Sequence, residues 1–364
     1  MRLNTSKRAL ALVALMAAVP ACRGGGTDEG GNGSGGNGSG GTGNSGALQC
    51  PNPGTLPFTT ESSSFESADS ADTEGLERNK DAASDILGNP GESYAYTTIP
   101  VEDSPLTAPY IFEGTKARSV NASGLSFTGF SEEYVSFWVE DGSSWKSLGR
   151  QKTDTDGKYS FSLNDFAGGQ PPRVSYAILE GDGSCAVHYT YLLDKGTKVV
   201  VTDIDGTLTS SDEELSKQIA DGSYDPQENK SASVMMNHWA QKGYQVVYLT
   251  ARPHFFRAET RAWMVEHGFP EGPVITANQL VFGDSARTYK GTWVNRIKNN
   301  FGWTVTAAYG NAGSDIDAYE DAGIPKDITF IIGEKAGESG TTAIAGNDYT
   351  AHIAEFVDTQ PDAN

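Results

Sequence analysis

The sequence has few cysteines, few positive charges and few long apolar runs. Three cysteines among 364 residues allow at most one internal disulfide. Only 27 lysines and arginines stand against 47 aspartates and glutamates, so the formal net charge is −20. Such an acidic surface does not attract nucleic acid or anionic lipid by bulk electrostatics, and we expect no nucleic-acid partner. After the apolar stretch 9–19, no run is long enough to cross a bilayer.

The first residues have the pattern of a secretory signal. A basic start precedes the short apolar core 9–19. Small Ala21 directly precedes Cys22, which resembles the lipobox of bacterial lipoproteins. The resemblance implies that 1–21 is removed and that Cys22 is lipidated; an ordinary cleavage site after a small residue is the alternative. The Gly-, Ser- and Asn-rich residues 22–49 then predict a flexible tether.

A lipid anchor with a tether predicts attachment at the cell envelope. The protein would face an extracytoplasmic compartment, either the periplasm or the outer-membrane face, with the membrane as a partner. With Cys22 lipidated, Cys50 and Cys185 remain as a pair in an oxidising compartment. We predict that they form a disulfide that ties the lead-in segment to the next part of the chain; two separate buried thiols are the alternative.

The rest of the chain divides into three parts. Residues 50–106 are polar and predict a loosely ordered lead-in with one helix. Residues 107–195 contain short alternating runs separated by turn residues, which predict an immunoglobulin-like β-sandwich. In 196–360, strand and helix patterns alternate, which predicts a doubly wound parallel α/β domain.

Within this third part the pattern locates four strands and four helices. The strands are expected at 198–203, 244–250, 303–310 and 327–333. The helices are expected at 231–243, 253–268, 292–302 and 315–323, the second beginning at Pro253 and ending at Gly268.

The stretch VVVTDIDGTLTSSD at 199–212 combines an apolar run with two carboxylates. The three valines lack the alternation of a half-exposed strand, so they predict a buried parallel strand. Asp203 and Asp205 follow at its carboxyl end, where ligands bind in open α/β sheets. A solvated polar turn is the alternative for an isolated pair of this kind.

Three further polar residues follow in the order that a reaction centre would need. Thr250 in YLTARP, Lys290 in TYKGTW and Asp315 in YGNAGSDIDAY fall at strand ends or in the loops beyond them. Together with the aspartate pair they make four polar stations on a βαβ background. The spacing therefore predicts a site at the carboxyl edge of the sheet.

These motifs resemble the haloacid dehalogenase-type phosphatases. DIDGTLT, YLTARP and YGNAGSDIDAYEDAGIP are most similar to the catalytic domain of lipins, the Mg-dependent phosphatidate phosphatases, and the resemblance covers 198–333. It implies a haloacid dehalogenase-like fold and a Mg²⁺ cofactor. Lipins also carry an immunoglobulin-like part. The segment 210–230 is too short for a folded cap domain, so we expect a minimal cap and an open site.

The resemblance assigns a role to each main residue. Asp203 corresponds to the nucleophile that forms an aspartyl-phosphate, and Asp205 to the general acid and base. Mg²⁺ would be held by the carboxylates of Asp203 and Asp315 and by the backbone carbonyl of Asp205. Thr250 and Lys290 would hold the phosphoryl oxygens.

Other residues have supporting or open roles. Gly206, Thr207, Arg252 and Asn311 are candidates for binding the substrate phosphate. Asp317 is a less favoured alternative to Asp315 as a metal ligand. Arg257 and Arg261 are interpreted as solvated side chains on an exposed helix face.

The predicted function is hydrolysis of phosphatidate or a related lipid phosphate by a monomeric enzyme. Two alternatives remain at this stage. One is a phosphatase of small soluble phosphomonoesters, because loops determine the choice of substrate and their sequences do not reveal it. The other is a sensor that binds phosphatidate without hydrolysing it; such domains lack one of the two aspartates, and both are present here.

Overall fold

The computed structural model describes most of the chain from residue 185 onward and separate segments before it. The described ranges are 51, 56, 112–113, 115–121, 124–129, 134–152, 158–159, 173–179, 185–189, 191, 193–220, 224–253, 257–277 and 281–363. The lipidation site Cys22, the tether, the proposed disulfide partner Cys50 and the lead-in helix lie outside these residues. What the sequence predicts for these residues stays a prediction.

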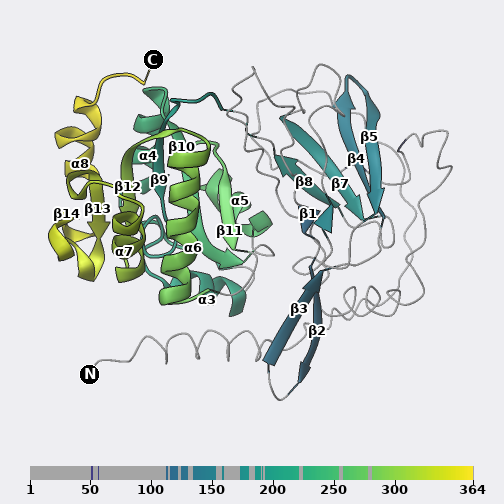
Figure 1. The fold of residues 1–364 in the computed structure, drawn as a ribbon, viewed down its shortest axis with the longest axis horizontal. Coiled ribbons are helices and arrows are strands. Elements are labelled where there is room, and N and C mark those ends of the chain that lie inside the picture. The colour runs from purple at the N-terminus through teal and green to yellow at the C-terminus, as the bar shows by residue number, and fades with distance from the viewer. Residues whose placement is uncertain are drawn as a thin grey trace, which may run out of the picture.

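A six-stranded parallel sheet forms the centre of the C-terminal part (Figure 1). Its strand order is β11-β10-β9-β12-β13-β14, and every neighbouring pair is parallel. The strands are β9 (Lys198–Thr202), β10 (Gln245–Pro253), β11 (Val274–Ala277), β12 (Thr304–Gly310), β13 (Thr329–Ile332) and β14 (Thr342–Ile344). The chain runs outward from β9 in one direction and then in the other. The switch point of this topology therefore lies at the end of β9.

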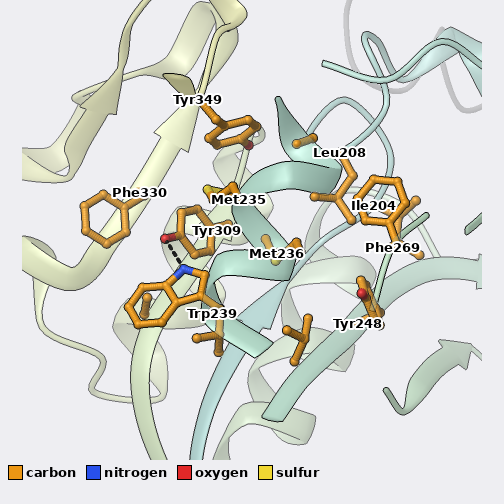
Figure 2. Packing of buried hydrophobic residues seen from close by; sticks show 14 of the residues in the cluster. Ile204, Leu208, Met235, Met236, Trp239, Tyr248, Phe269, Tyr309, Phe330 and Tyr349 are labelled. Carbon is orange, nitrogen blue, oxygen red and sulfur yellow. Dashed lines mark hydrogen bonds between the residues drawn. The ribbon is translucent and has the colours of Figure 1, made fainter. Parts of the chain in front are cut away.

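Helices cover both faces of the sheet. Alternate residues of β9 point to opposite faces and enter two different cores. Val200 faces a core with Met235 and Trp239 of α4 (Ala232–Gln241), shown in Figure 2. Val199 faces the other core with Val294 of α6 (Asp284–Asn295). Both strand faces are buried, which explains the unbroken valine run. The doubly wound parallel α/β prediction is confirmed.

The remaining helices are α3 (Glu213–Ala220), α5 (Arg257–Glu266), α7 (Gly313–Asp321) and α8 (Thr350–Glu355). The helix predicted from Pro253 begins later, because β10 continues to Pro253. The helix predicted at 292–302 begins earlier, at Asp284, and continues as a π-helical turn at Arg296–Asn300. Sequence patterns missed β11, β14, α3 and α8, which are too short to show a clear period.

The described part before residue 190 is antiparallel. One sheet has the order β5-β4-β7-β8, formed by Ser144–Lys152, Tyr134–Asp141, Val174–Leu179 and Cys185–Tyr189. β2 (Thr115–Asn121) pairs with β3 (Gly124–Gly129), and β1 (Phe112–Glu113) pairs with β6 (Lys158–Tyr159). These pairings agree with short antiparallel strands. The immunoglobulin-like sandwich itself stays a prediction.

Two arginines of α5 are not solvated, so that interpretation was wrong. Arg261 lies over the Tyr189 ring at 4.0 Å and donates to the Tyr191 hydroxyl at 3.1 Å. Arg257 is 4% exposed and donates to Thr276 at 2.6 Å. The antiparallel part supplies the rings that Arg261 stacks on, and the helix sequence alone does not show this neighbour.

Among the residues that the structure describes, no helix is both long enough and apolar enough to cross a membrane.

His352 makes the stability of the α/β part sensitive to acid. Its Nε2 lies 2.9 Å from the Tyr309 hydroxyl, and its ring packs against Phe330 at 4.3 Å. Burial lowers the pKa of His352 to about 4. The unfolded chain has an ordinary pKa near 6.5, so this stability is complete above pH 6.5 and is lost as the pH falls toward 4.

We expect the free energy of unfolding to drop by about 2 to 3 kcal/mol from this group between pH 7.5 and 4.5. Urea unfolding at both pH values would measure it. The His352→Gln variant is the control, because Gln cannot titrate there. An identical pH dependence in the variant and in the wild type would contradict the prediction.

Candidate active site

Asp203 is the first residue after β9 and lies at the switch point of the sheet. Its backbone N–H donates to the carbonyl of Tyr309 in the neighbouring strand β12 at 3.0 Å. Only 4% of the residue is exposed. Strands β9 and β12 therefore fix the position of Asp203 at the carboxyl edge of the sheet.

Lys290 joins Asp203 to Asp315. Its Nζ lies 2.9 Å from Oδ1 of Asp203 and 2.5 Å from Oδ1 of Asp315. The sequence had suggested a loop position for Lys290, but the residue lies inside helix α6. The other oxygen of Asp315 accepts the backbone N–H groups of Asn311 and Ala312 at 3.1 and 3.0 Å, at the start of α7. This bonding orients the carboxylate toward Lys290.

The three buried charges do not balance. Burial raises the pKa of Asp203 to about 8; Lys290 opposes the rise, and Asp315 and Asp205 add to it. Burial alone would lower the pKa of Lys290, but Asp203 and Asp315 outweigh it and hold that pKa above its ordinary value. Two carboxylates share one ammonium group, so the ionised form of Asp203 is disfavoured until a further cation is present.

Asp205 is paired with Arg252. Nη2 of Arg252 lies 2.8 Å from Oδ1 of Asp205, and its Nε lies 3.0 Å from Oδ2. The arginine side chain is 1% exposed and also donates to Thr260 at 3.0 Å. Thr250 donates to Asp205 at 3.4 Å and accepts the N–H of Arg252 at 3.1 Å. Arg252, a candidate for binding phosphate, is thus engaged with a carboxylate of the protein.

The turn after Asp205 packs against the loop after β12. Gly206 has φ +69°, and a Cβ there would lie 2.0 Å from Nδ2 of Asn311 and 2.4 Å from Oδ1 of Asp212. Asn311 donates to Asp212 at 2.8 Å and accepts from Thr207 at 3.2 Å. The site therefore needs glycine at this position. Asp212 was not among the predicted site residues, although it ends the motif stretch 199–212.

The donors at this edge fit a magnesium ion. Mg²⁺ needs only one or two carboxylates, because it keeps several waters. Asp203 and Asp315 lie against one ammonium group, and a divalent cation beside them would favour the ionised form of Asp203. Within the described ranges, no group of three or more His, Cys, Asp or Glu side chains is arranged to hold a metal. Asp317 instead pairs with Arg287 at 3.4 Å.

The fold and the site together define a class: a doubly wound α/β domain with an acidic site at its switch point. Residues 200–333 match the family model described as PITM 1-3, LNS2 domain. LNS2 is the Lipin/Ned1/Smp2 type of domain. The match shows that these residues are similar to an LNS2 domain.

Two curated relatives are similar over more than half of the chain. "Protein retinal degeneration B" of Drosophila melanogaster is 29% identical over 216 residues, which are 58% of this chain and 16% of that protein. "Membrane-associated phosphatidylinositol transfer protein 3" of Mus musculus is 27% identical over 217 residues, 58% of this chain and 21% of that protein. The chain thus spans about a fifth or less of these relatives.

Two solved structures are similar at a low level. A phosphoserine phosphatase in apo form has a TM-score of 0.33 and 13% identity, and the match covers 44% of this chain and 99% of that chain. A D,D-heptose 1,7-bisphosphate phosphatase from B. bronchiseptica, complexed with magnesium and phosphate, has a TM-score of 0.31 and 14% identity, over 43% and 97% of the two chains. The fold assignment therefore depends on the strand order of this chain itself.

Proposed function

We propose that this protein is a Mg²⁺-dependent phosphatase of phosphatidate or a related lipid phosphate monoester. One observation carries the proposal. Asp203 and Asp315 both form ion pairs with Lys290 at the sheet edge, and nearby Asp205 forms an ion pair with Arg252. Transfer of a phosphoryl group to an aspartate requires a carboxylate nucleophile, a second carboxylate that moves a proton, and positive charge around the phosphate. Asp203 and Asp205 would be the carboxylates. Lys290, Arg252 and a divalent cation would supply the positive charge.

The reaction would proceed in two steps. An oxygen of Asp203 bonds to phosphorus while the ester oxygen leaves, and Asp205 gives that oxygen a proton. A water then attacks the aspartyl-phosphate, gives its proton to Asp205 and frees Asp203 and phosphate. Mg²⁺, held by Asp203, Asp315 and the Asp205 carbonyl, would supply positive charge to the phosphoryl oxygens. Lys290 would do the same from the protein side.

A second candidate is binding of a phosphorylated lipid without hydrolysis. It is favoured by the Arg252 pair, because both oxygens of Asp205 accept guanidinium bonds and the pair must loosen before Asp205 can carry a proton. The mouse relative is named a phosphatidylinositol transfer protein. A phosphatase of small soluble phosphomonoesters is the third candidate.

Phosphate release distinguishes the three. The purified protein would be given phosphatidate in mixed micelles and a panel of soluble phosphomonoesters, each with Mg²⁺ and with EDTA. We expect Mg²⁺-dependent release that is fastest from phosphatidate. Faster release from a soluble ester would favour the third candidate. Micelle binding without release from any substrate would favour the second, and release in excess EDTA would contradict the role of Mg²⁺.

We also propose that the phosphatase is monomeric and anchored to the envelope membrane through Cys22. The basic start, the short apolar core, Ala21 and the tether 22–49 support the anchor. An anchored enzyme would meet a lipid substrate in the plane of its own membrane.

A further inference from the structure

We infer that Asn229 and Tyr349 are positioning residues that hold the turn Gly206–Thr209 in its working shape. Neither residue belongs to a recognised motif, and Tyr349 lies beyond the segment 200–333 that matches the family model. The hydrogen bonds that hold the turn are observed whether or not the protein is a phosphatase. Only the kinetic consequence rests on the proposed function.

Asn229 bonds every carbonyl of the turn. Its side-chain Nδ2 donates its two hydrogens to the carbonyls of Thr207 and Thr209 at 2.8 and 2.9 Å and shares one of them with the carbonyl of Gly206 at 3.3 Å. Its backbone N–H donates to the carbonyl of Leu208 at 2.7 Å. Asn229 is 2% exposed, so water does not replace these bonds easily. One buried residue thus directs four consecutive carbonyl oxygens toward itself.

Tyr349 supports the same turn from the C-terminal segment. Its hydroxyl donates to the carbonyl of Thr207 at 3.0 Å, and its ring belongs to the same core as Leu208 (Figure 2). Its backbone N–H donates to the carbonyl of Lys230 at 3.0 Å, and Lys230 pairs with Asp348 at 2.7 Å. The segment after β14 therefore also holds the stretch that carries Asn229.

This arrangement matters for an anionic ligand. Carbonyl oxygens carry partial negative charge and would repel a phosphate if they faced it. Asn229 and Tyr349 bond these carbonyls instead. The N–H groups of the turn are also used within it, because Thr207, Leu208 and Thr209 donate to the carbonyl of Ile204 and Gly206 donates to the Thr209 hydroxyl. The backbone N–H groups of Gly206 and Thr207, two candidates for binding the phosphate, are therefore engaged within the protein. The turn begins directly after Asp205, so its shape sets the direction of that carboxylate.

Amide hydrogen exchange of a peptide covering 203–209 tests the inference in the full chain. Asn229→Ala and Tyr349→Phe are the test variants. Two matched controls lose the same groups elsewhere. Asn237→Ala removes an amide that donates to the carbonyls of Ser233 and Gly268, and Tyr244→Phe removes a hydroxyl that donates to the carbonyl of Pro361.

We expect exchange in this peptide to rise roughly tenfold or more in Asn229→Ala and roughly threefold in Tyr349→Phe, with no change in the controls. With an aryl phosphate, kcat should fall by similar factors while KM stays within about threefold. If Asn229→Ala does not fold, Tyr349→Phe still decides the question. Unchanged exchange in Tyr349→Phe, or an equal rise in the controls, would overturn the inference. If exchange rises in the two variants but the wild type hydrolyses no phosphate ester, the inference about the turn stands and only the proposed function fails.

Discussion

Replacing Asp203 with Asn should abolish phosphate release and leave the protein folded. Asn has the same shape, keeps an oxygen for Lys290 and retains the backbone bond to Tyr309. It cannot form an acyl phosphate, and it removes one carboxylate from the proposed metal site. We expect turnover to fall by roughly 10⁴- to 10⁶-fold, as for other covalent nucleophiles.

The same substitution should not lower stability in the absence of divalent cations. Burial raises the pKa of Asp203 to about 8, so its ionised form is disfavoured in the folded protein. Near pH 7 the unfolded chain carries this group ionised, and folding is penalised accordingly. A neutral Asn removes that penalty. A thermal midpoint at or above that of the wild type, measured at pH 7 in EDTA, would show the expected conflict between stability and activity.

Asp317→Asn is the matched control for loss of a nearby carboxylate. Asp317 is on the same helix as Asp315, but its side chain is 47% exposed and faces Arg287. Its replacement should leave turnover unchanged. Residual phosphatase activity in purified Asp203→Asn, at the level of this control, would show that Asp203 is a polar strand end and would refute the proposed enzyme.

Replacing Asp205 with Asn should reduce turnover through proton transfer. We expect a loss of roughly 10²- to 10⁴-fold with an alkyl phosphate. The variant can still accept one bond from Arg252 through its carbonyl oxygen, but its amide nitrogen then faces the other guanidinium nitrogen. Loss of position and loss of the proton donor therefore occur together in this variant.

The leaving group separates these two effects. An aryl phosphate whose oxygen leaves without protonation should recover part of the Asp205→Asn defect in formation of the aspartyl-phosphate, measured as a burst of released phenolate. It should recover none of the Asp203→Asn defect. An equal loss with alkyl and aryl substrates would contradict the acid role and leave Asp205 as a partner of Arg252 alone.

Much of the site could be predicted from local patterns. The valine run before Asp203 and Asp205 is apolar at every position, and a strand buried on both faces has that composition. Parallel strands end at one edge, so residues after β9, β10 and β12 were expected to meet. The structure brings Asp203, Asp205, Thr250 and Asp315 to that edge.

Other contacts had no local signal. Arg252 was assigned to a substrate phosphate and is found on Asp205, because a guanidinium beside an acidic centre pairs with the nearest carboxylate. Asn229 stands in a polar stretch that reads as a loop, and Tyr349 precedes a helix of six residues. Their partners are backbone carbonyls twenty or more residues away, which no sequence period reports.

The sequence by itself determined the parallel α/β class, the carboxylate pair at the end of its first strand and the order of the other polar stations. These follow from local rules, since a strand buried on both faces must be apolar and parallel strands end at one edge of the sheet. Only the tertiary structure decided which charges meet. Lys290 reaches Asp203 and Asp315 from the middle of a helix, and Arg252 holds Asp205. The physical reason is that charge pairing and burial depend on distances between segments remote in sequence, and packing of the helices on the sheet sets those distances.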